Sequence, residues 1–104
     1  MIYLEHGGRK TLGQNAATAL YYWLLARCPA ATVKVQPDSL LEIKDVPKGV
    51  PQPGEQVITL AVAACEREFG KTPSYEESGS IEDRSNDILG WLKNNGDVTK
   101  LEYR

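Results

Sequence analysis

The feature that most constrains the fold is a helical repeat between Thr11 and Cys28. Apolar side chains recur there at steps of three and four residues, the spacing that places side chains on one stripe of an α-helix. The stripe consists of Leu12, Ala16, Ala19, Leu20, Trp23 and Leu24. Thr11 is a suitable N-cap, and Pro29 would stop the helix. We therefore expect a helix over residues 11–28.

Four other segments show the alternation of strands or the turn signals that bound strands. Residues 32–36 and 40–44 alternate apolar and charged side chains, and Pro37-Asp38-Ser39 between them is typical of a tight turn. They are expected to form a hairpin. Met1–Leu4 reads as an opening strand and Val98–Tyr103 as a closing one. The sequence thus predicts a sheet of four strands.

Two further helices are expected in the second half of the chain. Residues 55–69 carry an apolar side, and Gly70 fits the position just past a helix end. A third apolar stripe runs up to Gly96. Ser80 resembles the N-cap of this last helix, and Ser85 is the competing N-cap.

The predicted order is β-α-β-β-α-(α)-β within one compact α+β domain, residues 1–104. Two β-α-β crossovers that share one antiparallel sheet give a ferredoxin-like, two-layer sandwich, here with an extra helix before the last strand. A chain of 104 residues is large enough to bury one core. With 41% hydrophobic and 25% charged residues, it has the composition of a globular domain.

Charge and cysteine usage narrow the function classes. Twelve Lys and Arg against 14 Asp and Glu give a net charge of -2, which offers no general attraction to nucleic acids or to anionic membranes. Cys28 and Cys65 show no metal or redox spacing and are expected to be buried free thiols. The opening residues lack a signal peptide pattern, so we expect a cytoplasmic protein. No metal, cofactor or catalytic residue is predicted.

The glycine pair near the start is a candidate anion site. His6, Gly7, Gly8 and Arg9 follow the first expected strand, and Asn15 lies one turn into the expected helix. Glycine amides, a helix N-terminus and an arginine together can bind phosphate or carboxylate. The same pattern is also typical of a simple turn. A small hydrolase or anion-binding domain is therefore the alternative function.

The back of the first expected helix is a candidate partner surface. At 100° per residue, Thr18, Tyr21, Tyr22 and Leu25 point away from the apolar stripe. Tyrosine is favoured at protein interfaces because it buries a large ring at low entropy cost. The alternative is that another element of the fold covers these side chains.

An acidic loop could extend that surface. Tyr75, Glu76 and Glu77 lie in a polar segment that could dock on a basic partner. The leading hypothesis is therefore a small non-enzymatic binding or regulatory module, such as an inhibitor or adaptor, that acts through a protein interface. Its partner would be another protein or a second copy of the chain.

Overall fold

The computed structural model describes residues 1–27 and 53–104. The described chain forms three strands and three helices, in the order β1-β2-α1-α3-α4-β3. The elements are β1 (Ile2–His6), β2 (Arg9–Gly13), α1 (Ala16–Arg27), α3 (Pro53–Phe69), α4 (Ile81–Asn94) and β3 (Val98–Tyr103). This is an α+β fold, as the sequence predicts.

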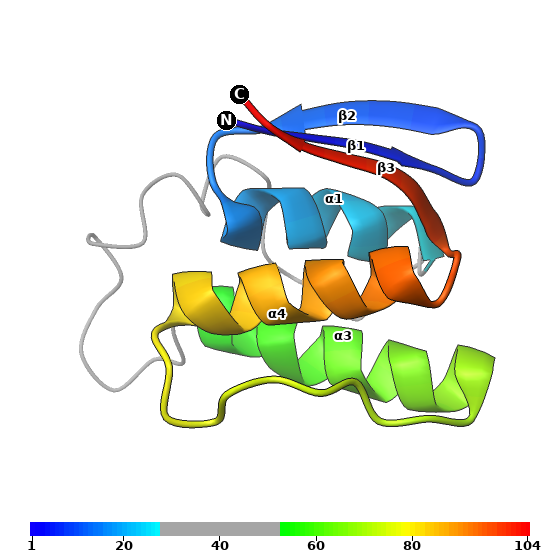
Figure 1. The fold of residues 1–104 in the computed structure, drawn as a ribbon. Coiled ribbons are helices and arrows are strands. Elements are labelled where there is room, and N and C mark those ends of the chain that lie inside the picture. The colour runs from blue at the N-terminus through cyan, green and yellow to red at the C-terminus, as the bar shows by residue number, and fades with distance from the viewer. Residues whose placement is uncertain (28–52) are drawn as a thin grey trace.

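The sheet is antiparallel, with β1 between β2 and β3. Gly7 and Gly8 connect β1 to β2 with φ angles of 54° and 76°. A two-residue hairpin turn with positive φ at both positions favours glycine, because L side chains are strained there. On the other side of β1, the two chain ends lie together, and the Arg104 amide donates to the Met1 carbonyl at 2.6 Å (Figure 1). The first and last segments of the chain therefore close one sheet.

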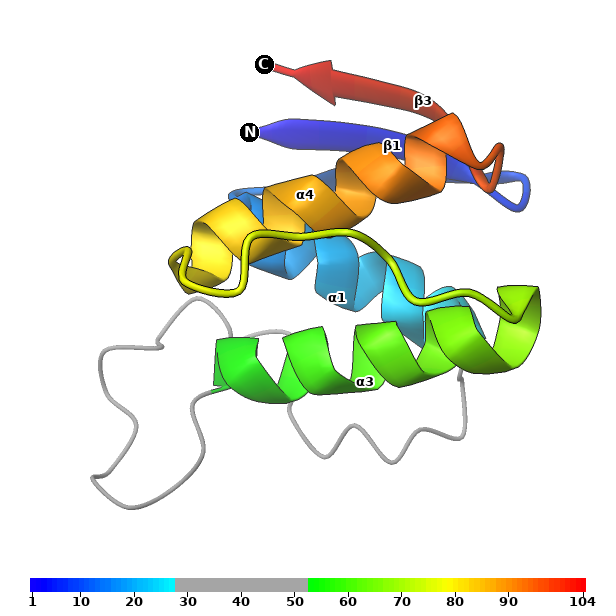
Figure 2. The same ribbon diagram turned by 60° about the horizontal axis from the view of Figure 1, so that its bottom comes forward.

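Helix α1 lies at the centre of the molecule. It packs against β1 and β2, against α3 and against α4 (Figures 1 and 2). Its sequence, AATALYYWLLAR, holds a single charged residue, Arg27. Helices that are apolar on all sides are buried on all sides, and Leu20, Trp23 and Leu24 are almost fully enclosed.

The neighbours of α1 supply the rest of one hydrophobic core. Small residues allow close approach: a side chain at Gly13 would place its Cβ 2.8 Å from the Ala19 amide nitrogen, so only glycine fits there. The other contributors are apolar side chains of β1, α3, α4 and β3, namely Ile2, Leu4, Val57, Ile58, Ala61, Ala64, Cys65, Ile88, Leu89, Leu92 and Val98.

A carboxylate from α4 caps the N-terminus of α1. Glu82 accepts hydrogen bonds from the amides of Ala16 at 2.7 Å and Ala17 at 3.3 Å. Asn15 accepts from the Thr18 amide at 2.8 Å. Amides in the first turn of a helix have no partner within the helix, and negative charge is favourable there. Glu82 thus joins α4 to α1 through backbone groups.

Helix α4 is in turn fixed at its own start. The Ser80 side chain accepts from the Asp83 amide at 3.0 Å, which confirms Ser80 as its N-cap. Arg84 forms two hydrogen bonds with Glu55 of α3, at 3.1 and 2.5 Å. These contacts hold α3, α4 and α1 in one arrangement.

The first helix begins later than the sequence predicts. Residues 9–13 form β2 instead, because the Gly7-Gly8 turn folds them back onto β1, and α1 begins only at Ala16. The strands expected at 32–36 and 40–44 lie outside the described residues. A ferredoxin-like sheet would place one of those strands beside the first strand, but β2 occupies that place. The ferredoxin-like order is therefore not the order of the described sheet.

Within residues 1–27 and 53–104, no helix combines the length and the apolar character needed to cross a membrane. Helix α3, the longest of the described helices, has 17 residues and carries charged side chains in its first and last turns.

The cap on α1 gives a first prediction. Replacing Glu82 with alanine leaves the amides of Ala16 and Ala17 without their acceptor, so the free energy of unfolding should fall by about 1–2 kcal/mol. Urea denaturation followed by circular dichroism measures this. Glu77→Ala is the matched control, with an expected change within about 0.5 kcal/mol. Equal stability of the two variants would contradict the capping role.

Candidate functional site

A groove of about 550 Å³ lies between the segment 74–76 and α4. Its helical wall is one exposed side of α4, because the lining positions recur at intervals of three and four residues. The lining residues are Ser74, Tyr75, Glu76, Asn86, Asp87, Gly90, Trp91 and Asn94. Two aromatic rings, two amides and two carboxylates thus converge on one open surface.

The non-helical wall of the groove is held in place by hydrogen bonds. The Glu76 amide donates to Asp87 Oδ2 of α4 at 2.9 Å. The Ser78 hydroxyl donates to Glu76 Oε1 at 2.8 Å, and the Gly79 amide donates to the Glu76 carbonyl at 2.9 Å. Pro73 is buried at the base of this segment. These contacts fix the segment that forms the non-helical wall, so the shape of the groove is set by the fold.

Aromatic side chains mark the groove and its border. Trp91 is half-buried and packs against Phe69, with ring centroids 6.0 Å apart. Tyr75 is half-buried on the opposite wall. Beside the groove, Tyr103 is 64% exposed and donates its hydroxyl to Asn86 Oδ1 at 3.0 Å. Large accessible rings of this kind are typical of binding surfaces.

The groove is acidic. Glu76 and Asp87 are among the lining residues, and no lysine or arginine is among those described. Burial raises the pKa of Tyr103, and the nearby carboxylates of Glu82 and Asp87 raise it further. The field around this side of α4 therefore favours positive charge.

Gly90 opens the floor of the groove. It lies in the interior of α4, where glycine costs about 1 kcal/mol relative to alanine. A Cβ at this position would meet nothing within 4 Å, so packing does not require glycine. The missing side chain instead leaves space between Asn86 and Asn94, one turn away on either side.

The expected surface on the first helix is largely enclosed. Thr18 is 1% and Tyr21 is 2% exposed, so other parts of the fold cover them, which is the alternative that the sequence left open. Tyr22 and Leu25 are half-buried and pack against the core. The physical reason is that α1 lacks a polar side, so its apparent back is also covered.

The acidic loop behaves differently. Tyr75 and Glu76 line the groove, and Glu77 is exposed next to it without lining it. Sequence reasoning missed the α4 side of the groove, although Asn86, Gly90 and Asn94 recur every four residues. That regular spacing of polar and glycine positions was the available signal.

The glycine loop does not connect a strand to a helix. His6, Gly7, Gly8 and Arg9 form the β1-β2 hairpin turn. Asn15 lies beyond the far end of β2, where its side chain caps α1. The structure therefore separates Asn15 from the other four residues.

A second, smaller cavity adjoins this turn. It has a volume of about 150 Å³ and is lined by His6, Gly7, Arg9, Ala26, Arg27 and Asp97. Asp97 forms an ion pair with Arg27 and accepts from Trp23 Nε1 at 2.6 Å. Burial lowers the pKa of His6, and the charges of Arg9 and Arg27 lower it further. Arg27 and Asp97 were not identified from the sequence.

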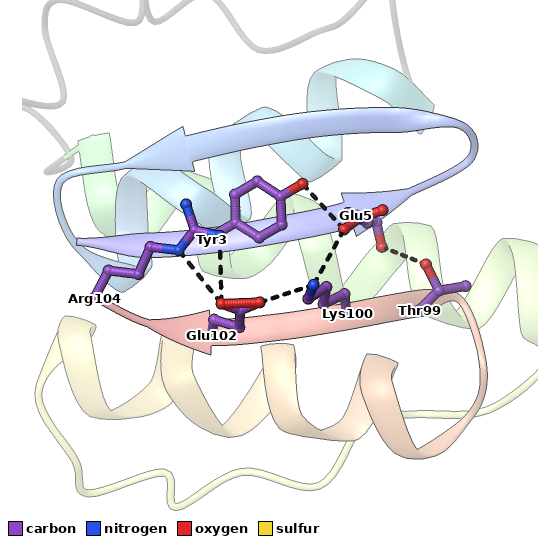
Figure 3. A network of polar contacts seen from close by, with 6 residues as sticks. All are labelled: Tyr3, Glu5, Thr99, Lys100, Glu102 and Arg104. Carbon is purple, nitrogen blue, oxygen red and sulfur yellow. Dashed lines mark hydrogen bonds and ion pairs between the residues drawn. The ribbon is translucent and has the colours of Figure 1, made fainter.

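The outer face of the sheet carries a network of mutually paired charges (Figure 3). Lys100 contacts Glu102 at 3.0 Å and Glu5 at 3.9 Å, while the Tyr3 hydroxyl donates to Glu5 at 3.0 Å. The guanidinium carbon of Arg104 lies 4.0 Å from the centre of the Tyr3 ring. Exposed pairs of this kind are worth little individually. The two cations and two carboxylates of this network therefore balance one another on a solvated surface.

In the described part of the chain, potential metal ligands do not cluster and the one cysteine is buried. No three His, Cys, Asp or Glu residues there lie close enough to hold a metal ion. Cys65 is a buried free thiol, and burial raises its pKa to about 11. At neutral pH this thiol is protonated and therefore a poor nucleophile.

The environment of His6 predicts a pH dependence. Because the folded protein lowers the pKa of His6 below its ordinary 6.5, the unfolded chain binds more protons just below that pH. The stability should therefore decrease as the pH falls below about 6.5. His6 is the only histidine, so its Hε1 proton resonance reports the titration directly. A midpoint at or above 6.5 would contradict the placement of this side chain.

Comparison with known proteins gave no relative. No protein-family model, curated protein or solved structure matches the chain. The side chains of the two cavities and their surroundings are therefore the features that point to a function.

Proposed function

We propose that the protein is a small, non-enzymatic binding module that accommodates a basic segment of a partner protein in the groove on α4. It would act by occupying the partner's surface, as an inhibitor or adaptor does. The observation that carries this proposal is Gly90, a helix-interior glycine without a packing reason at the floor of an acidic, aromatic groove.

The groove offers complementary chemistry for an extended basic segment. The carboxylates of Glu76 and Asp87 can pair with a lysine or arginine. The rings of Tyr75 and Trp91 can bind the same cation through their faces. The side-chain amide of Asn94 can hydrogen-bond to a peptide backbone, since an amide both donates and accepts.

A partner protein explains these features better than a small ligand does. The groove is open along one side of a helix, whereas small-molecule sites are concave and enclose most of their ligand. Tyr103 continues the aromatic surface beyond the groove. A second copy of the chain remains an alternative partner. A cytoplasmic setting also belongs to this proposal, and the free thiol of Cys65 supports it.

Selection from a phage-displayed library of random 12-residue peptides tests the proposal. Enriched peptides should carry lysine or arginine, because the lining residues described are acidic, aromatic or neutral. Glu76→Lys should weaken binding of the selected peptides by at least about tenfold, since it reverses one charge in the groove. Biolayer interferometry measures the affinities.

The neighbouring residue provides the control for that experiment. Glu77→Lys makes the same change of charge one residue along, outside the groove, and should change the affinity by no more than about threefold. Failure to enrich basic peptides, or an equal effect of the two substitutions, would overturn the proposed function.

Gly90 gives an independent prediction. Gly90→Ala should raise the free energy of unfolding by about 0.5–1 kcal/mol, because alanine favours the helix and its Cβ meets no atom. Gly90→Leu should fill the floor and abolish binding of the selected peptides without unfolding the protein. Thermal denaturation and the same interferometry assay measure both effects. Loss of stability in Gly90→Ala, or full binding by Gly90→Leu, would contradict the described groove.

A further inference from the structure

The cavity beside the β1-β2 turn has the composition of a site for a small anion. Two arginines from different elements line it, Arg9 at the start of β2 and Arg27 at the end of α1. Asp97 is the only carboxylate among its described lining residues. With His6 neutral, the described lining residues carry two positive charges and one negative charge. The described lining therefore has an excess of one positive charge.

One arginine is held in place and the other is free to bind. Arg27 pairs with Asp97 and stacks on Trp23 and Phe69, with its guanidinium carbon 5.9 and 5.4 Å from the ring centres. Arg9 pairs with His6 only through the backbone of the sheet; in the described part of the chain its side chain forms no hydrogen bond or ion pair, and the residue is exposed. A fixed cation beside an uncommitted one is suited to binding an anion between them.

His6 supplies an independent observation. His6 is only 3% exposed, and its Nε2 is buried without a hydrogen-bond partner. A buried polar atom without a partner is costly, so such an atom usually has one. Because His6 also lines the cavity, a molecule bound there can satisfy Nε2. A neutral imidazole can donate from this nitrogen.

We propose that this cavity binds one small oxyanion, a phosphate or a carboxylate group, between Arg9, Arg27 and the imidazole of His6. The volume of about 150 Å³ equals roughly five water molecules at their liquid volume, which is room for one such group. Gly7 adds a backbone without a side chain to the wall. Among the described residues, this site shares no lining residue with the groove on α4.

Binding should be coupled to protonation of His6. Among the described residues, the charges that act on His6 are Arg9 from β2 and Arg27 from α1, and Asp97 from the α4-β3 connection lines the same cavity. A bound oxyanion offsets the two cations that disfavour protonation, so it should raise the pKa of His6. By linkage, the affinity should then increase as the pH falls through this range.

Titration of the full chain with sodium phosphate and with sodium acetate, at constant ionic strength maintained with sodium chloride, tests the proposal. The Hε1 resonance of His6 should shift in a saturable manner, and its titration midpoint should rise. Saturation by phosphate alone assigns a phosphate site, and saturation by acetate assigns a carboxylate site. The proposal is overturned if neither anion gives a saturable shift at concentrations up to about 50 mM, which is well above a millimolar dissociation constant.

Two surface substitutions distinguish a site from general charge screening. Arg9→Gln should weaken binding about tenfold or more, because it removes the uncommitted cation. Lys10→Gln is the control: it removes the same charge from the next residue, which lies opposite Glu5 on the outer face of the sheet. Retained binding in Lys10→Gln and lost binding in Arg9→Gln would support the site. Equal losses, or no loss, would overturn it.

Discussion

Burial of α1 on all sides is the constraint on which the rest of the described structure depends. A helix with one charged residue in twelve cannot face water along its length. The hairpin of β1 and β2 covers one side, α3 covers another, and α4 covers a third (Figures 1 and 2). Each covering element brings an apolar side of its own. The outer surfaces of these elements are then left for function.

Helix α4 connects this core to both its supports and its groove. Its inward side places Ile88, Leu89 and Leu92 in the core, and Glu82 at its start caps α1. Its outward side carries Gly90 and Trp91 in the groove. Because the inner side is fixed by packing and by a carboxylate-amide contact, the outer side presents the groove in a defined position. Binding of a partner in the groove is therefore expected to need little movement of the helices and the sheet.

The sequence was informative where a local pattern decides the structure. Helical periodicity predicted α3, Ser80 as an N-cap predicted the start of α4, and alternation predicted β3. All three predictions lie close to the observed bounds. It failed at Thr11, because pairing of residues 9–13 with β1 outweighs the helical spacing of Leu12. It left open whether Thr18 and Tyr21 are exposed, since exposure depends on how many elements surround a helix. Neither the pairing of residues 9–13 with β1 nor the number of elements around α1 can be read from a short stretch of sequence.

In both candidate sites, local sequence identified some of the residues, and only the tertiary structure identified the others. The acidic loop around Glu76 was found from composition, but its other wall comes from α4 and required the tertiary structure. The glycine loop was found from its residues, whereas Arg27 and Asp97 join it from positions far along the chain. Long-range pairs of this kind have no local signal. Both cavities are formed by residues that are close in the folded structure, and their spacing along the sequence does not reveal this.

The groove on α4 is proposed to recognise a cationic side chain. A two-dimensional ¹H-¹⁵N NMR titration of the labelled protein with N-acetyl-arginine methylamide tests this directly. Saturable shifts are expected at the Trp91 indole and at the side-chain amides of Asn86 and Asn94, while the Trp23 indole, which is buried and hydrogen-bonded to Asp97, stays unchanged. Shifts confined to the outer face of the sheet, or no saturable shift in the groove, would contradict it.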